Sequence, residues 1–272
     1  MSVCYAVASG KGGVGKSVIT ANLSAAIAVN GSRVLVIDAD IGLRSQDALL
    51  GLENRVVYDL VDLAKKECMP EQAILNSETI PSLHLLPAAQ FERAKSLEPK
   101  KFRRIIHSLR DSYDYIFIDC PAGIERGLRN VLNAGVDETI LIATPDDISV
   151  RSAERAAQII EEKHSPRPRL IVNRLNSQLV RSGEMMSART VSQVLDLQLL
   201  GIVPEDPAVC RALLKHALFV GYECNARDAV RRIAARLQGQ SIPFPACEVR
   251  KPSLFHRLFS KSFREVIPID DH

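Results

Sequence analysis

Hydrophobic and polar positions along the chain fall into two patterns that alternate. Short apolar runs, rich in β-branched residues, have the length and composition of buried strands. Each run is followed by a stretch in which apolar residues recur at helical spacing. The runs occupy residues 3–8, 33–37, 115–118, 139–143, 170–173 and 200–203, and the helical pattern is clearest at 17–30, 101–112, 150–163 and 226–237.

This alternation predicts an α/β fold with a mostly parallel central sheet and helices on both faces, because the runs are apolar throughout rather than alternately polar. Functional groups of such folds gather at the carboxyl ends of the strands. The pattern stops after Leu237 in a segment rich in Gly and Pro. We therefore divide the chain of 272 residues into a domain (1–238), a linker (239–250), an amphipathic helix (251–267) and a short tail (268–272).

Composition narrows the classes of protein that fit. No stretch approaches the roughly 20 apolar residues of a spanning helix, and the first strand begins at Val3, which leaves no room for a cleavable leader. The six cysteines lack paired spacing, so we expect reduced thiols rather than disulfides or a zinc site. These features predict a cytoplasmic protein.

A glycine-rich loop joins the first predicted strand to the first helical pattern. The spacing is that of a P-loop in its strand, loop and helix context, in which backbone N–H groups surround phosphate oxygens. Lys16 is expected to neutralise the β and γ phosphates, and the Ser17 hydroxyl to hold Mg²⁺. The predicted nucleotide-binding loop is Gly10, Lys11, Gly12, Gly13, Val14, Gly15, Lys16 and Ser17.

A second lysine near the start of this loop, Lys11, is not required by the P-loop pattern. It resembles the signature of the deviant Walker A ATPases, the MinD/ParA family of P-loop NTPases. The resemblance implies that the nucleotide is ATP and that the protein forms an ATP-dependent homodimer. It further implies that Lys11 crosses the interface to the partner's nucleotide and stabilises transition-state charge, as an arginine finger does.

Acidic residues close two other predicted strands. Asp38 and Asp40 are two residues apart, so they point the same way from an extended chain. Asp119 ends another apolar run and is followed by a turn that contains Gly123. By resemblance, Asp40 orients the attacking water, Asp38 and Asp119 belong to the Mg²⁺ network, and Gly123 moves toward the γ-phosphate. The expected catalytic residues are Lys11, Lys16 and Asp40, and the expected metal site is Ser17, Asp38 and Asp119.

Polar residues also follow two later strands, where members of the family hold the adenine base. Between Asn173 and Arg174 we favour Asn173, because an amide offers an adenine edge both a donor and an acceptor. The second group of candidates is Pro204, Glu205 and Asp206.

The C-terminal segment carries the excess of positive charge. Residues 247–267 contain five bases and two acids, against a net charge of +3 for the whole chain. Its apolar residues fall on one face at helical spacing, which is typical of a helix that lies on an anionic membrane surface. The predicted membrane contacts are Leu254, Phe255, Arg257, Leu258, Phe259, Lys261 and Phe263.

The whole chain most resembles the MinD branch of the family, through residues 38–44, 55–59, 86–88, 121–125, 149–151 and 201–206 and the amphipathic C-terminus. The resemblance implies an ATPase that binds the inner face of the cell membrane reversibly and positions the division septum. Its expected partners are a MinC-like division inhibitor and a MinE-like or other topological regulator. Ser45 and Ser152 differ from residues common in this branch.

Three alternatives remain open. A regulator of flagellar number similar to FlhG would carry an extension before the P-loop. A ParA-type DNA-partitioning ATPase would bind nucleic acid, which we do not expect because charge over the main domain is balanced. An iron–sulfur carrier similar to the nitrogenase iron protein would need two suitably placed cysteines, and Cys120 is the one candidate after the strand that ends at Asp119.

Overall fold

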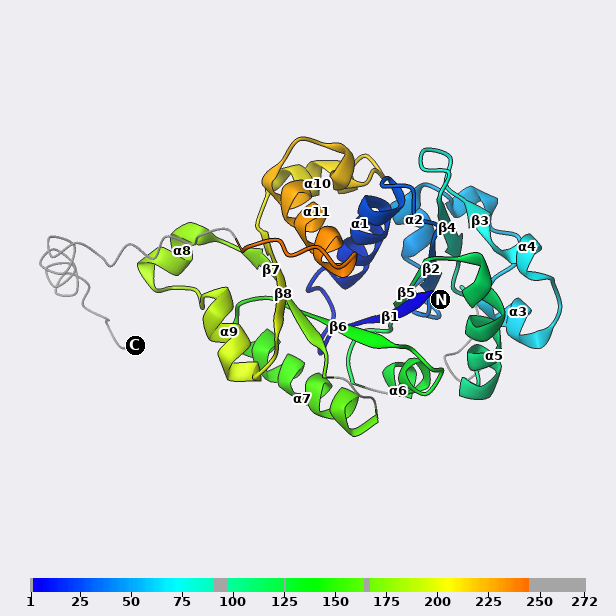
Figure 1. Cartoon of the computed structure of the whole chain (residues 1–272), viewed down its shortest axis with the longest axis horizontal. Helices are drawn as coiled ribbons and strands as arrows, with labels where there is room; N and C mark the ends of the chain where they lie inside the picture. The colour runs from blue at the N-terminus through cyan, green and yellow to red at the C-terminus, as the bar shows by residue number, and fades with distance from the viewer. Residues whose placement is uncertain (1, 91–96, 125, 164–166, 245–272) are drawn as a thin grey trace, which may run out of the picture.

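The computed structural model describes residues 2–90, 97–124, 126–163 and 167–244 as one sheet covered by helices (Figure 1). Eight strands follow the order β3-β4-β2-β5-β1-β6-β7-β8, and only β3 pairs antiparallel to its neighbour. The strands are β1 (Val3–Ala8), β2 (Val34–Asp38), β3 (Leu75–Asn76), β4 (Leu83–Leu86), β5 (Tyr115–Asp119), β6 (Glu138–Ala143), β7 (Arg169–Leu175) and β8 (Leu199–Pro204). The predicted fold is confirmed.

Helices connect the strands and cover both faces of the sheet (Figure 1). No described helix is long and apolar enough to cross a membrane. The α-helices are α1 (Lys16–Ala28), α2 (Gln46–Leu50), α3 (Leu60–Lys65), α4 (Pro70–Ala73), α5 (Pro99–Leu109), α6 (Arg126–Leu132), α7 (Asp147–Lys163), α8 (Ser177–Ser182), α9 (Ala188–Leu195), α10 (Pro207–Leu213) and α11 (Asn225–Leu237). Short 3₁₀ turns are η1 (Glu53–Arg55), η3 (Arg110–Ser112) and η4 (Phe219–Gly221).

The sheet separates two apolar cores. One core contains buried side chains of α3, α5, α6, α7 and α9, including Phe102, and the other contains those of α1, η4 and α11. In the second core the rings of Tyr5 and Phe117 stack at 5.1 Å across neighbouring strands. Because apolar side chains fill both faces, the strands read as continuous apolar runs in the sequence.

Several elements escaped the sequence patterns. The edge pair β3 and β4 is short, and the half-buried His84 interrupts the apolar run of β4. The family segment 86–88 contributes only Leu86 to the sheet. Helix α3 begins at Leu60 after the N-cap residue Asp59, whose carboxylate accepts backbone N–H groups in a capping box. Short helices of four to eight residues, such as α4, α8 and α9, give too few turns for a clear helical period.

Strand order brings the predicted site residues to one edge of the sheet. Strand β1 lies at the centre between β5 and β6, and β2 lies on the other side of β5. Asp38 and Asp119 occupy the same register position at the ends of β2 and β5, and Val7 of β1 lies opposite Asp119. The P-loop after β1 is therefore next to both acids.

Candidate functional site

The P-loop has the backbone geometry that a phosphate cradle requires. Gly13 and Gly15 adopt positive φ angles of 82° and 89°, which glycine reaches without strain. A Cβ atom on Gly10 would lie 2.0 Å from the Ser152 carbonyl oxygen, and one on Gly15 would lie 2.5 Å from the Asn173 amide nitrogen. Helix α1 starts at Lys16, so its first N–H groups have no partner within the helix and face the loop's end. This backbone fits a polyphosphate.

Lys16 lies inside an acidic cluster. Its side chain is 5% exposed, and its Nζ is 2.5 Å from Asp119 Oδ1 and 3.4 Å from Ser17 Oγ. Burial lowers the pKa of Lys16, but the ion pair with Asp119 raises it more, so that the net shift is upward. Lys16 is therefore charged, and it joins the loop to the end of β5.

Gln46 is a member of the cluster that sequence reasoning missed. Its side chain is fully buried, and Nε2 donates to Asp119 Oδ2 at 2.7 Å and to the Ser17 carbonyl oxygen at 3.0 Å. The only signal in the sequence is a polar residue soon after Asp38, which no motif singles out. Gln46 ties the first residue of α2 to β5 and to α1.

Asp38 holds the loop that leads to α2. Its carboxylate accepts three backbone N–H groups at 3.0 Å, from Asp40, Ser45 and Gln46. Complete burial and the charge of Asp119 raise the pKa of Asp38 to about 7, against the opposing effect of those N–H groups and Lys16. The Asp38 carboxylate thus shapes the loop that leads from β2 to α2.

Asp40 lies at the margin of the cluster and is half-buried. Burial raises its pKa, while Lys16 lowers it and Asp119 raises it further. Asp40 is thus within electrostatic reach of both cluster residues. Gly123 also belongs to this edge, because its N–H donates to the Ser9 carbonyl oxygen at 3.1 Å and its φ is 89°.

Lys11 stands apart from the cluster. Its Nζ is 3.2 Å from Asp146 Oδ1 just before α7, and the two side chains are 33% and 49% exposed. The loop presses closely on α7, as the approach of Gly10 to Ser152 shows. The two lysines of the P-loop thus have different surroundings, since Lys16 is buried among acids and Lys11 is at the surface.

The adenine candidates follow two paired strands, β7 and β8, and have different contacts. Asn173 is 6% exposed and donates to the Val14 carbonyl oxygen at 2.8 Å, so its amide stabilises the backbone of the P-loop. Arg174 is exposed with φ 58°. Pro204 and Glu205 line a cavity of about 540 Å³ at the ends of β7 and β8.

Asp206 has a structural task next to that cavity. Its carboxylate accepts the N–H of Ala208 at the start of α10 and that of Ala226 in α11. It caps one helix and joins it to the other, and its oxygens are therefore engaged within the fold.

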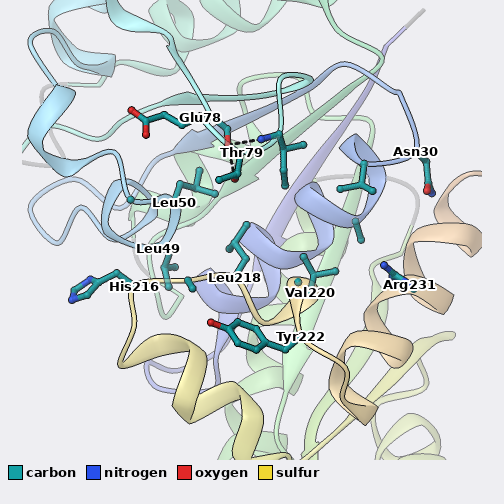
Figure 2. A pocket seen from close by; sticks show the side chains of 17 residues that line it. Asn30, Leu49, Leu50, Glu78, Thr79, His216, Leu218, Val220, Tyr222 and Arg231 are labelled. Carbon is teal, nitrogen blue, oxygen red and sulfur yellow. Dashed lines mark hydrogen bonds between the residues drawn. The ribbon is translucent and has the colours of Figure 1, made fainter.

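A separate cavity of about 900 Å³ lies beside α2 (Figure 2). Leu49 and Leu50 of α2, the β3–β4 turn at Thr79, and Leu218 and Tyr222 near η4 line it. None of the predicted nucleotide residues contributes to its wall.

The donor set at the strand ends fits a magnesium ion that also binds phosphate. Ser17 offers a hydroxyl, and Asp38 and Asp119 offer carboxylates, the oxygen ligands that Mg²⁺ prefers. Among the described residues no group of three or more His, Cys, Asp or Glu has the arrangement of a metal site. Mg²⁺ often binds through one or two protein oxygens together with water and substrate phosphates, so a sparse set suits it.

Cys120 follows Asp119 and is completely buried, with its Sγ 3.8 Å from the Ile118 carbonyl oxygen. Burial is the main reason that the pKa of its thiol is raised. The predicted membrane contacts at 254–263 lie outside the described residues, and so do the helix 251–267 and part of the linker.

Replacing Lys16 by alanine is expected to weaken nucleotide affinity about 100-fold or more, because charge-assisted contacts to phosphate are lost. Equilibrium titration with a fluorescent ADP analogue measures this loss. Lys11→Ala is the matched control, since it removes the other lysine of the same loop and is expected to keep monomer affinity within about threefold. Equal losses in the two variants would contradict the different roles of the two lysines.

The same Lys16→Ala variant has an expected effect on stability. Lys16 lowers the pKa of Asp38, so its removal raises that pKa further above the value in the unfolded chain. A carboxyl with a raised folded-state pKa loses stabilising effect as the pH rises. The gap in unfolding free energy between parent and variant should therefore widen as the pH rises above about 7, the pKa of Asp38 in the parent. Urea unfolding of the nucleotide-free proteins measures the gap, and a constant gap would contradict this coupling.

Comparisons with known proteins identify the family to which the chain belongs. The ParA family, described as NUBPL iron-transfer P-loop NTPase, matches residues 1–238. The septum site-determining protein MinD of Bacillus subtilis is 38% identical over 267 residues, which is 97% of this chain and 98% of that protein.

Solved structures give the same relationship. MinD in the MinC:MinD cell division complex of Aquifex aeolicus is 34% identical, with a TM-score of 0.83 over 90% of this chain and 98% of that one. MinD of Pyrococcus horikoshii, complexed with Mg-ADP, is 29% identical, with a TM-score of 0.78 over 87% and 96%. The chain belongs to the ParA family of P-loop NTPases, in its MinD branch.

Proposed function

We propose that this protein is an ATPase that dimerises with ATP, binds an anionic membrane reversibly and positions the division septum. The observation that carries the proposal is that two lysines of one loop have different surroundings. Lys16 is buried on Asp119, whereas Lys11 is at the surface and pairs with Asp146. A lysine at the surface beside the P-loop is available to a second copy of the chain.

ATP with Mg²⁺ would lie against the P-loop and the acidic edge of the sheet. The N–H groups of residues 12–17 and the Lys16 ammonium would bind phosphate, and Ser17 and Asp119 would hold the ion. Mg²⁺ supplies charge neutralisation at the phosphates when bound. Relatives are consistent with this, since the Pyrococcus horikoshii MinD was solved with Mg-ADP.

Hydrolysis requires a water in line with the γ-phosphate. Asp40 is half-buried beside the cluster, so its carboxylate can orient such a water while the polyphosphate is held by other groups. Lys11 of the partner subunit would stabilise the charge on the phosphoryl oxygens. Gly123, whose N–H is bonded to Ser9, would turn toward the γ-phosphate.

Replacing Asp40 by alanine is expected to lower kcat about 100-fold, within the range for loss of a general base or water-orienting group. ATP affinity and ATP-dependent dimerisation should remain, because Asp40 does not hold phosphate. Phosphate release and analytical gel filtration of the same preparation measure the two properties. Unchanged turnover would remove Asp40 from this role.

Helix α7 is the surface we assign to a MinC-like inhibitor. Ile148 at its start is 71% exposed and Arg151 is exposed beside it. A relative occurs in a MinC:MinD complex. The same helix carries Asp147 close to the Lys11 pair, so partner binding and dimerisation would use neighbouring surfaces. A MinE-like or other regulator would act on the membrane-bound dimer.

A second function follows from the family description, which mentions iron transfer. Cys120 is the cysteine nearest the nucleotide residues in sequence, but it is fully buried. Iron analysis of the purified protein tests this function directly. Pelleting with anionic vesicles, compared with DNA-shift assays in ATP and ADP, separates the septum-positioning function from DNA partitioning.

A further inference from the structure

Gln46 presents an unusual combination of contacts. It is fully buried, and its Nε2 donates to both Asp119 Oδ2 and the Ser17 carbonyl oxygen. Its Oε1 is buried and has no hydrogen-bond partner. A buried acceptor without a donor is costly, so its presence in a site of charged and polar groups calls for a physical explanation.

The orientation of this amide follows from its neighbours. Both partners of Nε2 are oxygen acceptors, a carboxylate and a carbonyl, so only the nitrogen end can face them. Exchanging the two ends would set oxygen against two oxygens. The unpartnered atom is therefore the oxygen, and what it lacks is a donor.

The surroundings limit where that donor comes from. Asp119 Oδ1 is taken by Lys16 and Oδ2 by Gln46, and Asp38 accepts backbone N–H groups. Phosphate oxygens accept but do not donate. Among the groups that a magnesium nucleotide would bring to Ser17 and Asp119, the donors are water molecules on the ion, because Mg²⁺ usually keeps several of its waters.

We propose that Gln46 is a positioning residue of the nucleotide site, whose Oε1 accepts a hydrogen bond from water on the nucleotide's Mg²⁺ while its Nε2 holds Asp119. The inference rests on the proposed nucleotide function. The two ends of the Gln46 amide then have different roles. Its Nε2 donates to Asp119, and its Oε1 accepts from the water on Mg²⁺.

The position of Gln46 in the chain gives this contact a further effect. Gln46 is the first residue of α2, and its own N–H donates to Asp38. A metal-borne water bonded to Oε1 would thus be linked to the loop 40–45 that carries Asp40. The arrangement of that loop would respond to the ion as well as to the phosphates.

The test compares binding of a fluorescent ADP analogue, N-methylanthraniloyl-ADP, in excess Mg²⁺ and in EDTA. The ratio of the two dissociation constants is the magnesium gain. Gln46→Met keeps the side-chain length and removes both polar ends, so the magnesium gain should fall about tenfold, the size expected for a hydrogen bond to a charged group. Affinity in EDTA should stay within about twofold.

Gln46→Glu separates the two tasks. It keeps an acceptor oxygen but loses the donor, and it sets a carboxylate against Asp119. We expect it to retain the magnesium gain and to lower the melting temperature of the nucleotide-free protein. Leu50→Met, a volume-conserving change on the same helix, is the control and should alter neither quantity.

The outcomes are distinct. Equal weakening by Gln46→Met in Mg²⁺ and in EDTA, or an unchanged magnesium gain, would overturn the metal role of Oε1, and so would loss of the gain in Gln46→Glu. If the parent protein binds the nucleotide in neither condition, the proposed function fails and the inference with it. If the parent binds the nucleotide more tightly in Mg²⁺ than in EDTA, the proposed nucleotide function stands, and the variants then test only the role of Gln46.

Discussion

Replacing Lys11 by alanine is expected to abolish the ATP-dependent dimer and thereby to lower the protein's ATP turnover by about 10³-fold or more, the scale of a catalytic cation supplied in trans. Lys11 pairs with Asp146 of its own subunit. An exposed ion pair of this kind contributes at most about 1 kcal/mol, so a partner's phosphates can displace it. Analytical ultracentrifugation with ATP and with ADP measures the dimer.

The matched control for this prediction is Asp146→Asn. It removes the intramolecular partner of Lys11 and leaves the lysine in place, so dimerisation with ATP should be kept or slightly strengthened. If Lys11→Ala still forms a nucleotide-dependent dimer, the lysine does not act across an interface. If Asp146→Asn loses the dimer, Asp146 has a role of its own there.

Replacing Phe255 by glutamate is expected to release the ATP-bound dimer from anionic vesicles while basal ATP hydrolysis continues. Phe255 lies in the middle of the predicted apolar face, and burying a Phe side chain contributes roughly 1.5–3 kcal/mol. Two tails on one dimer make the second insertion intramolecular, which raises avidity about 10²–10⁴-fold. Losing the anchor from both subunits should remove most of this gain. Sedimentation with phosphatidylglycerol vesicles measures it.

Phe244→Glu is the control, because it makes the same chemical change outside the anchor. The Phe244 ring lies 4.1 Å from the guanidinium of Arg236, close to the end of α11, and a glutamate there could pair with that arginine. This variant should pellet with vesicles as the parent does. If the parent binds vesicles equally with ADP and ATP, membrane binding is not controlled by dimerisation.

The sequence predicted the fold because the strands that matter most are apolar on both faces. β1, β5 and β6 are almost entirely buried, so their composition alone separates them from the helices. The P-loop was equally clear, since Gly10 and Gly15 have neighbours that leave no space for a side chain. Such positions accept only glycine, so they can be recognised in the sequence.

Other parts of the site could not be predicted, because they depend on contacts between distant segments. Gln46 donates a hydrogen bond to Asp119, which is 73 positions away in the chain, and no local sequence pattern predicts this contact. The place of Asp38 in the Mg²⁺ network stays a prediction, and the sequence did not predict that its carboxylate also accepts three N–H groups of the following loop. The predicted contact of Asp206 with the adenine base stays a prediction, and the sequence did not predict that its carboxylate caps α10.

Strand order has a consequence for how the chain folds during synthesis. β1 is made first, yet its two neighbours in the sheet begin at Tyr115 and Glu138. At roughly 5–20 residues per second, a ribosome needs about 5–20 s to supply the first of these partners. During that time β1 and the P-loop have no neighbouring strands with which to pair. Pairing across such sequence distances is slow. We therefore expect a chaperone near the ribosome exit to bind the exposed apolar segments that are made early.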